Sequence, residues 1–497
     1  MAGGAPVHHT TTVDNPDNIK VAQPWPSNTA AYGSLAIIIV ATFINFFDAT
    51  VFGMMAERIK TTFDLTDEQL GFLGGPANVI FYMFVGIPIA RLADIYPRKY
   101  VLAGGISIIG AVTALGGLAQ NFWQFVATRM FVGAGGSAHA PASYSLLADS
   151  FPPKKITRAF ALLQLGFIGG TTLGVYFGGM MIGYVSDMEA IQWMGLTIHN
   201  WQLILIFIGM PGLIIGGIFL LLKEPVRRMP PSTEAVFEVA DKNAPFGKKI
   251  LTFMGLDAAK AINVKGAVYY PLFIGLALSA IESQGLAFWR TPFMIRTYGW
   301  DEAQIGQVMA PMILAASLIG MVLGGVFVEW LAKRYKDANV RAATILFACV
   351  TVCSIAAPMM PTGESSLIVM SIGAVFGIAG AVPQNAAIQR IAPQAMRGQV
   401  TAIYLFMFTF FGAMGSMVIG TVAQRIFVDP QDLWKAMVST AAILLPLATY
   451  SMYRGIKPYR EEIERMEAAE AEALAAAEAQ QAAQDAAAVT ATEGKGI

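Results

Sequence analysis

The sequence predicts an all-α membrane protein in which twelve transmembrane helices form two pseudo-symmetric six-helix bundles. The first observation is composition: 55% of the 497 residues are hydrophobic, only 13% are charged, and the mean hydropathy is +0.56. Soluble globular proteins carry about 25% charged residues. The second is that apolar spans long enough to cross about 30 Å of hydrocarbon recur between short polar turns. The third is that the two halves of the chain repeat each other.

The predicted elements follow one another from Tyr32 onward. We place the spans near 32–56, 70–90, 98–118, 122–148, 158–185, 200–222, 267–289, 302–331, 340–360, 366–389, 399–424 and 434–453. Residues 1–29 are polar and interrupted by prolines, without the apolar region of a signal peptide, so we expect a disordered tail. The one long inner loop, 223–266, is proline-rich and separates the bundles 30–222 and 267–455. Residues 456–497 are Ala/Glu-rich, and we expect a solvated helix that frays and has no function of its own.

Basic residues give the orientation. The predicted inner loops are rich in Lys and Arg, whereas the outer loops carry only Arg58, Lys60, Arg290, Arg296, Arg425 and Lys435. By the positive-inside rule both termini are cytoplasmic. The sequence contains no Asn-x-Ser/Thr acceptor, which favours a bacterial inner membrane. A formal charge of zero and the lack of a basic block argue against nucleic acid as a partner, and we expect a monomer.

The internal repeat is visible in small residues and prolines. Gly170, Gly174 and Gly178 recur as Gly412, Ser416 and Gly420, each 242 positions later by subtraction, and Pro141 maps to Pro383 by the same offset. Rows of small residues also serve ordinary helix packing. Their recurrence predicts the parallel repeat on which alternating-access transporters are built.

Arg129 is the one basic residue that lies clearly inside a predicted span. A guanidinium stays charged, and its insertion into hydrocarbon costs at least about 3 kcal/mol, so it faces a bundle interior or a wet cavity and finds a partner. Asp48 and Arg129 lie about eight and about seven residues from the outer ends of their spans, which places them at nearly the same depth. We predict that they pair, and that their approach and separation change the proton affinity of Asp48. The alternative is a snorkelling anchor at a helix end.

Charged loops recur at the predicted cytoplasmic mouth. ARLADIYPRKY (90–100) contains Asp94, Arg98 and Lys99, and GGVFVEWLAKRY (324–335) contains Glu329 and Arg334. FPPKKITRA, IAPQAMRGQ and KEPVRR follow the fourth, tenth and sixth spans, and WRTPFMIRTYGW follows the seventh. Over about residues 32–455 these motifs resemble the major facilitator superfamily and, within it, the Spinster-like branch of lipid and organic-solute transporters.

The resemblance implies that two six-helix halves rock about a central site. It also implies that the charges of the first loop latch the cytoplasmic side, and that those of the second loop form a weaker copy. This chain departs from the family pattern, because Ala90 stands where the loop usually begins with Gly and Ile95 replaces the basic residue after the acid. The alternative is that these loops carry ordinary positive-inside charge.

The stretch INFFDATVFG resembles the family's Asn-x-x-Asp segment and aligns Asp48 with its intramembrane acid. The resemblance further implies an acid in the fourth span, where this chain has Gly136. Glu282 in the seventh span is a candidate replacement, and His139 is another. His139 would otherwise hydrogen-bond a backbone carbonyl exposed by Pro141. Polar residues inside spans that would line a cavity or join helices are Asn45, Asn78, Gln164, Tyr176, Gln284, Gln384, Asn385 and Tyr404.

We therefore expect a secondary active transporter, driven by protons, for an amphiphilic small molecule or organic anion. No phosphate-binding loop occurs, so ATP is not the expected energy source, and we expect no cofactor. Cys349 and Cys353, four apart in one apolar span, indicate packing and no metal site. An uncoupled facilitator of the same fold is the first alternative. A membrane-embedded transferase is the second, although its cluster of His, Asp or Glu near a membrane face is missing from the sequence.

Overall fold

The computed structural model describes residues 25–193, 195–225, 262–392 and 397–493. The N-terminal half consists of α1 (Asn28–Met54), α2 (Ala56–Phe63), α3 (Asp67–Gly74), α4 (Pro76–Ile95), α5 (Arg98–Gly116), α6 (Phe122–Ser137), α7 (His139–Ser150), α8 (Pro153–Val185), the antiparallel pair β1 (Ile191–Trp193) and β2 (Leu196–Ile198), and α9 (Asn200–Leu221). The expected tail at 1–24 and most of the expected linker, 226–261, lie outside the described residues.

The C-terminal half begins with α13 (Gly266–Tyr298), and α14 (Glu302–Ala332) and α15 (Ala338–Ala356) follow it. It continues with the 3-10 turn η1 (Ala357–Met359), α16 (Gly363–Ile391), α17 (Arg397–Val422), the π-helical turn η3 (Ala423–Phe427), the 3-10 turn η4 (Pro430–Asp432) and α18 (Leu433–Glu493). Each of the twelve expected spans corresponds to one helix or to two consecutive helices, as predicted.

Ten helices in the described part of the chain are long and apolar enough to cross a membrane. The other two expected spans are the pairs α3–α4 and α6–α7. Pro141 lacks a backbone N–H and its ring would clash with the carbonyl of Ser137 four residues earlier, so α6 ends at Ser137 and α7 begins at His139. Pro76 occupies the first turn of α4, directly after Gly75.

The seventh span is longer than predicted. We expected it to end at 289, but α13 continues to Tyr298, where Gly299 with φ 68° caps the helix in the left-handed conformation. Arg290 and Arg296 therefore do not lie in an outer loop, as the sequence suggested, but on the last turns of α13.

The first residues of the expected C-terminal tail, 456–497, belong to the packed bundle and are not a solvated helix. The helix α18 runs without interruption through Pro458, and its residues Tyr459 and Ile463 are 0% and 1% exposed. Both belong to a hydrophobic cluster with Tyr269 of α13 and Val340 of α15. The expected boundary at 455 consequently cuts through a packed element, and the exposed stretch begins only after about two further turns.

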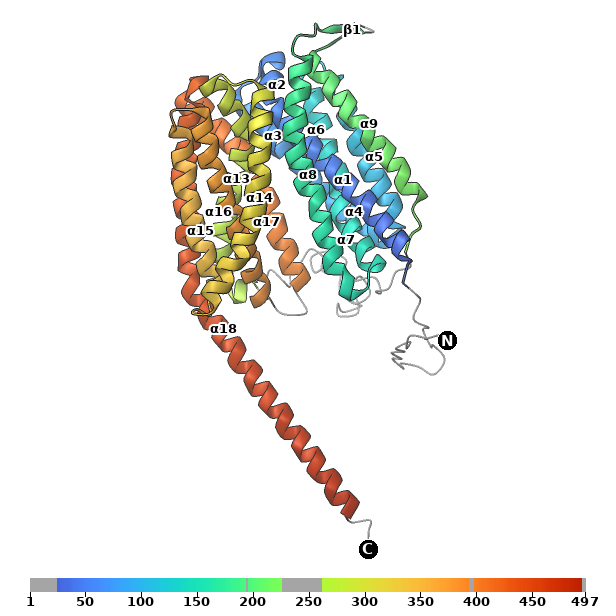
Figure 1. Cartoon of the computed structure of the whole chain (residues 1–497), viewed down its shortest axis with the longest axis vertical. Coiled ribbons are helices and arrows are strands. Elements are labelled where there is room, and N and C mark those ends of the chain that lie inside the picture. The colour runs from blue at the N-terminus through green and yellow to red at the C-terminus, as the bar shows by residue number, and fades with distance from the viewer. Residues whose placement is uncertain (1–24, 194, 226–261, 393–396, 494–497) are drawn as a thin grey trace, which may run out of the picture.

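Figure 1 shows the two halves as separate bundles that meet near α2, α3, α8 and α14 and diverge toward the end that carries both termini. We call this end the inner end, following the charge-based orientation, and the opposite end the outer end. The helices that join the halves are α8 with α14 and α3 with α17.

Both junctions are close backbone approaches that require glycine. A Cβ atom on Gly71 or Gly75 would overlap the backbone of α17 at Ser416 or Ala413. At the other junction, a Cβ on Gly306 of α14 would lie 2.8 Å from a carbonyl oxygen of α8. Any side chain at these positions would push the halves apart, so small residues hold the outer end closed.

Candidate functional site

Asp48 and Arg129 lie together in the N-terminal bundle, as predicted. Arg129 Nη1 of α6 is 3.6 Å from Asp48 Oδ2 of α1, and both residues are 3% exposed. The rings of Phe52 and Phe125 flank the guanidinium, whose central carbon is 5.0 and 5.4 Å from their centroids. This burial argues against a snorkelling anchor and gives the cation two aromatic faces as well as a carboxylate.

The pair is incompletely hydrogen-bonded. Asp48 Oδ1, Arg129 Nε and Arg129 Nη2 are buried without a hydrogen-bond partner among the described residues. A paired arginine and carboxylate normally share two parallel hydrogen bonds of about 2.7–2.9 Å. Each buried polar atom without a partner costs about 1–3 kcal/mol, so this arrangement favours any change that supplies a proton or a new partner.

Local sequence makes room for the pair. A Cβ on Gly116 of α5 would lie 3.2 Å from Thr128 Oγ1 and 3.5 Å from Arg129 Nη2, so α5 packs closely beside the guanidinium. One turn further along α6, Gly133 lies against the backbone of Asn78 in α4. These glycines allow α6 to pack closely between α4 and α5, which fixes the depth of Arg129.

His139 lies near the break between α6 and α7 and contacts α1. Its Nε2 is 2.7 Å from Thr42 Oγ1, which itself donates to the carbonyl of Ile38 at 2.8 Å. Because the hydroxyl proton is used in that bond, the ring nitrogen donates to Thr42. His139 thus joins two helices about six residues below Asp48, or about 9 Å along α1, and the expected bond to a carbonyl exposed by Pro141 is not what holds it.

Glu282 lies on α13 and is 3% exposed. Its side chain interacts with the Ser354 hydroxyl of α15, inside the C-terminal bundle. The structure therefore does not bring Glu282 to Arg129. A second cation, Arg290, lies two turns further along the same helix. The residue is partly exposed, but its Nε is buried without a partner among the described residues. Arg129 is thus not the single arginine inside a span, because the sequence boundary of the seventh span was too short to reveal Arg290.

Two residues of the expected inner latch, Arg98 and Lys99, contact acids of their own half. Arg98 binds Asp149 at the end of α7 at 2.6 Å, and the Arg98 and Lys99 backbone N–H groups both donate to Glu224. The side chain of Asp94 lies outside the described residues. Sequence reasoning missed Asp149 and Glu224 because it considered one loop, whereas the contacts come from three segments distant in sequence.

The second predicted latch is not formed in this arrangement, in which the inner ends of the two halves diverge, and its closing role stays a prediction. Glu329 and Arg334 are exposed, and Arg334 stacks over Trp330 at 5.2 Å. At the inner end of the C-terminal half, Asp337 forms ion pairs with Arg341 and Arg460. Its side chain is fully buried between them. Burial raises the pKa of Asp337, but the hydrogen bonds from these arginines outweigh it and hold the pKa below its ordinary value.

The cavity candidates fall into different environments. Gln164 and Gln284 are exposed, whereas Gln384 is 2% exposed and Tyr404 lies in the hydrophobic cluster with Tyr459. Tyr404 is therefore a core residue. Those of intermediate exposure are Asn45, Asn78, Tyr176 and Asn385. No group of three or more His, Cys, Asp or Glu suited to a metal ion occurs among the described residues.

Ion pairs that the sequence analysis did not anticipate close the outer end. Arg58 of α2 donates to both carboxylate oxygens of Glu302 at 2.7 and 3.1 Å. Arg296 of α13 donates to both oxygens of Asp67 at 2.8 Å and to Glu57 at 2.8 Å. Because each pair joins opposite halves, these contacts stabilise the closed outer end. The sequence did contain a signal for these ion pairs. In each half an acid, Asp67 or Glu302, directly follows the N-capping residue of a helix.

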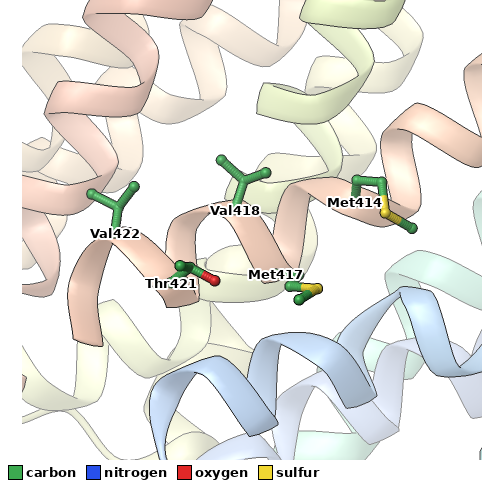
Figure 2. Close-up of a pocket in the computed structure, with 5 residues that line it drawn as sticks. All are labelled: Met414, Met417, Val418, Thr421 and Val422. Atoms are coloured by element: carbon green, nitrogen blue, oxygen red, sulfur yellow. The ribbon is translucent and has the colours of Figure 1, made fainter. Parts of the chain in front are cut away.

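An apolar pocket lies on α17 beside the junction with α3. Its volume is about 280 Å³, and the lining side chains in Figure 2 are Met414, Met417, Val418, Thr421 and Val422. In that view Met417 lies toward the blue ribbon of the N-terminal half. Methionine side chains adapt to ligands of different shape, so this surface suits an alkyl or aryl group.

Comparison with known proteins gives consistent results. The family model for the Major Facilitator Superfamily matches residues 38–416. An MFS-type efflux pump of Mycolicibacterium smegmatis is 22% identical over 87% of this chain and 94% of its own length. The Drosophila melanogaster protein spinster is 22% identical over 63% of this chain and 49% of its own length. A gentisate transporter of Corynebacterium glutamicum is 22% identical over 86% of this chain and 89% of its own length.

Among solved structures, a bacterial homologue of the human lysosomal transporter Spinster shares the fold. It was solved in an inward-facing, unoccupied conformation, with a TM-score of 0.67 and 22% identity over 88% of this chain and 98% of that one.

Proposed function

The chain belongs to the Major Facilitator Superfamily and is a membrane transporter, and on that premise we propose that it couples proton movement to the transport of an amphiphilic small molecule or organic anion. The two halves would rock about a central site, with both termini in the cytoplasm of a bacterial cell, and the working unit would be the monomer. The observation that carries this proposal is the buried, incompletely hydrogen-bonded pair of Asp48 and Arg129.

The pair can act as a proton switch. When Asp48 is ionised, Arg129 is held toward α1. Protonation of Asp48 removes the attraction and frees Arg129, which then requires another anion or water. Because Asp48 lies on α1, which contacts α13 of the other half, a change in its protonation would change the packing between the halves.

The substrate class rests on three features. Apolar side chains line the pocket on α17, and exposed polar groups such as Gln164 and Gln284 lie within spans. Relatives of similar length include an efflux pump and a transporter named for gentisate, an aromatic carboxylate. An amphiphile with an apolar body and a polar or anionic group fits both surfaces.

The proposal is tested with purified protein in proteoliposomes, by measuring uptake of radiolabelled gentisate under an imposed pH gradient. We expect Asp48→Asn to abolish gradient-driven uptake, because the amide has a similar volume but does not titrate. Exchange of substrate without net proton movement would survive. The control is Val40→Ala, an exposed residue of α1 outside the candidate site.

Full gradient-driven uptake in Asp48→Asn would refute the coupling role. Wild-type flux that does not respond to the pH gradient would favour the uncoupled facilitator, in which Asp48 and Arg129 serve packing alone.

A further inference from the structure

We propose that Arg290 is a second anion-binding residue of the transport site, placed in the C-terminal half to hold the carboxylate or phosphate oxyanion of an amphiphilic substrate. This inference rests on the proposed transport function and deepens it, since it specifies that the substrate is anionic and that Arg290 binds the anionic group. The anion would therefore bind at a different residue from the proton, which binds beside Arg129.

The first support is that Arg290 carries an uncompensated charge. It lies inside α13 between Trp289 and Thr291, which are 0% and 4% exposed. Its Nε is buried, and the described residues offer it neither a hydrogen bond nor an ion pair. Glu282 lies eight residues, or about 12 Å, nearer the inner end of α13 and interacts with Ser354 instead. A permanent charge in a membrane helix persists where an anion or a wet cavity compensates it.

The second support is that Arg290 borders an exposed strip of α13. Ser283, Gln284 and Ala287 are exposed, although α13 packs on α17 and α18 within its own half. The same face continues outward to Phe288 and Thr291. This strip therefore faces the N-terminal half, and Figure 1 shows that the two halves diverge toward the inner end.

The contacts of Phe288 and Thr291 show that this face of α13 is directed toward α1 of the N-terminal half. The Phe288 ring centroid is 6.2 Å from that of Phe52 in α1, and Thr291 Oγ1 donates to the sulfur of Met54 at 3.3 Å. Side chains in a helix point back toward its N-terminus, over residues three and four positions earlier. The Arg290 guanidinium is thus directed over Leu286 and Ala287, toward Ser283. Arg290 itself is partly exposed, in contrast to Arg129.

The third support is the difference between the two arginines. Arg129 is 3% exposed and already contacts Asp48 and two phenylalanine rings. A substrate anion would have to displace all three. Arg290 has free donors beside an exposed strip, so an oxyanion there gains charge-assisted hydrogen bonds without breaking an existing pair.

The experiment measures the thermal unfolding of the full chain in lipid nanodiscs with three probes of equal chain length: octanoate, octanamide and octylammonium. We expect octanoate alone to raise the unfolding temperature of the wild type in a concentration-dependent manner, since a ligand that binds the folded state stabilises it. Arg290→Gln should weaken the apparent octanoate affinity by at least about tenfold. Arg290→Lys should retain a preference for the anion, and Arg454→Gln, an exposed arginine of α18, is the matched control.

A second variant covers the case in which Arg290→Gln does not fold. Ser283→Glu places a carboxylate on the exposed strip within reach of Arg290 and should compete with octanoate. Sodium sulfate at matched ionic strength tests whether an inorganic anion alone has the same effect.

Equal effects of the three octyl probes on the wild type would overturn the proposal, as would unchanged octanoate preference in Arg290→Gln or in Ser283→Glu. No proton gradient enters this measurement. If gradient-driven transport fails but the octanoate preference is intact, the coupling mechanism is refuted and the anion site stands. If transport responds to the gradient but the octanoate preference is absent, the anion site is refuted and the coupling mechanism stands.

Discussion

Asp67 and Glu302 stand 235 positions apart by subtraction of residue numbers, each is the first residue of a helix, and each binds an arginine of the opposite half. Arg296 of the C-terminal half reaches Asp67, and Arg58 of the N-terminal half reaches Glu302. The acids also benefit from the positive ends of helices α3 and α14. The internal repeat thus closes the outer end with two ion pairs exchanged between the halves.

The first prediction concerns this closure. Arg58→Gln with Arg296→Gln should shift the protein toward an outward-open state, because each substitution removes charge-assisted contacts worth about 1–3 kcal/mol. Spin labels at the exposed positions Thr61 and Gln304, with the two native cysteines replaced, would report a longer distance. Arg425→Gln, which breaks a more exposed ion pair with Glu68, is the control and should shift the distribution less. Identical distributions in the double variant and the wild type would show that these ion pairs do not hold the outer end closed.

The second prediction concerns pH. Burial raises the pKa of Asp67, but hydrogen bonds and charge from Arg296 and Lys60 outweigh it, so the pKa lies below the ordinary value of 3.8. A group with a lowered pKa stabilises the paired state above its ordinary pKa, and this contribution is lost as the pH falls through the lowered pKa. We expect the spin-label distance at the outer end to increase in that acidic range. Asp67→Asn should remove this response, and an unchanged pH dependence in this variant would contradict the prediction.

The third prediction concerns Arg129. Arg129→Ala should abolish gradient-driven transport, because it leaves Asp48 buried without a countercharge. Arg129→Lys keeps the charge but loses the planar fork and the stacking on Phe52 and Phe125, so it should restore transport only in part. Initial rates in proteoliposomes across a pH series would measure both effects. Normal transport by Arg129→Ala would mean that the pair has a structural role only.

The fourth prediction concerns the C-terminal tail. A chain truncated after Gly455 should lose stability, because Ile463 alone contributes about 1.5–3 kcal/mol when fully buried, and Asp337 would lose Arg460. A chain truncated after Glu472 should unfold at nearly the wild-type temperature, since the helix is exposed from 468 to 472 and the removed residues 475, 476 and 478 are exposed as well. Thermal unfolding in detergent compares the two. Equal stability of both truncated chains would show that the first turns of the tail do not support the bundle.

Sequence alone determined the properties that depend on local composition and spacing. The twelve spans follow from the length of apolar stretches, and the pairing of Asp48 with Arg129 follows from depth counted along two helices and the cost of a lone charge in hydrocarbon. The parallel repeat also appears in the sequence, because helix packing requires small residues at equivalent positions in both halves.

Tertiary structure alone decided which groups from distant segments meet. Asp67 and Arg296 are 229 positions apart, and Arg98 contacts Asp149 and Glu224 only after three segments assemble. The ends of two helices also depend on tertiary packing. The helix α13 extends past Arg290 and α18 extends past Pro458, because packing against neighbouring helices stabilises them where a charged residue or a proline would otherwise end a span. Local sequence sets which residues can lie in a membrane, but the partners of a charge depend on contacts between helices, and these are not encoded in any single stretch.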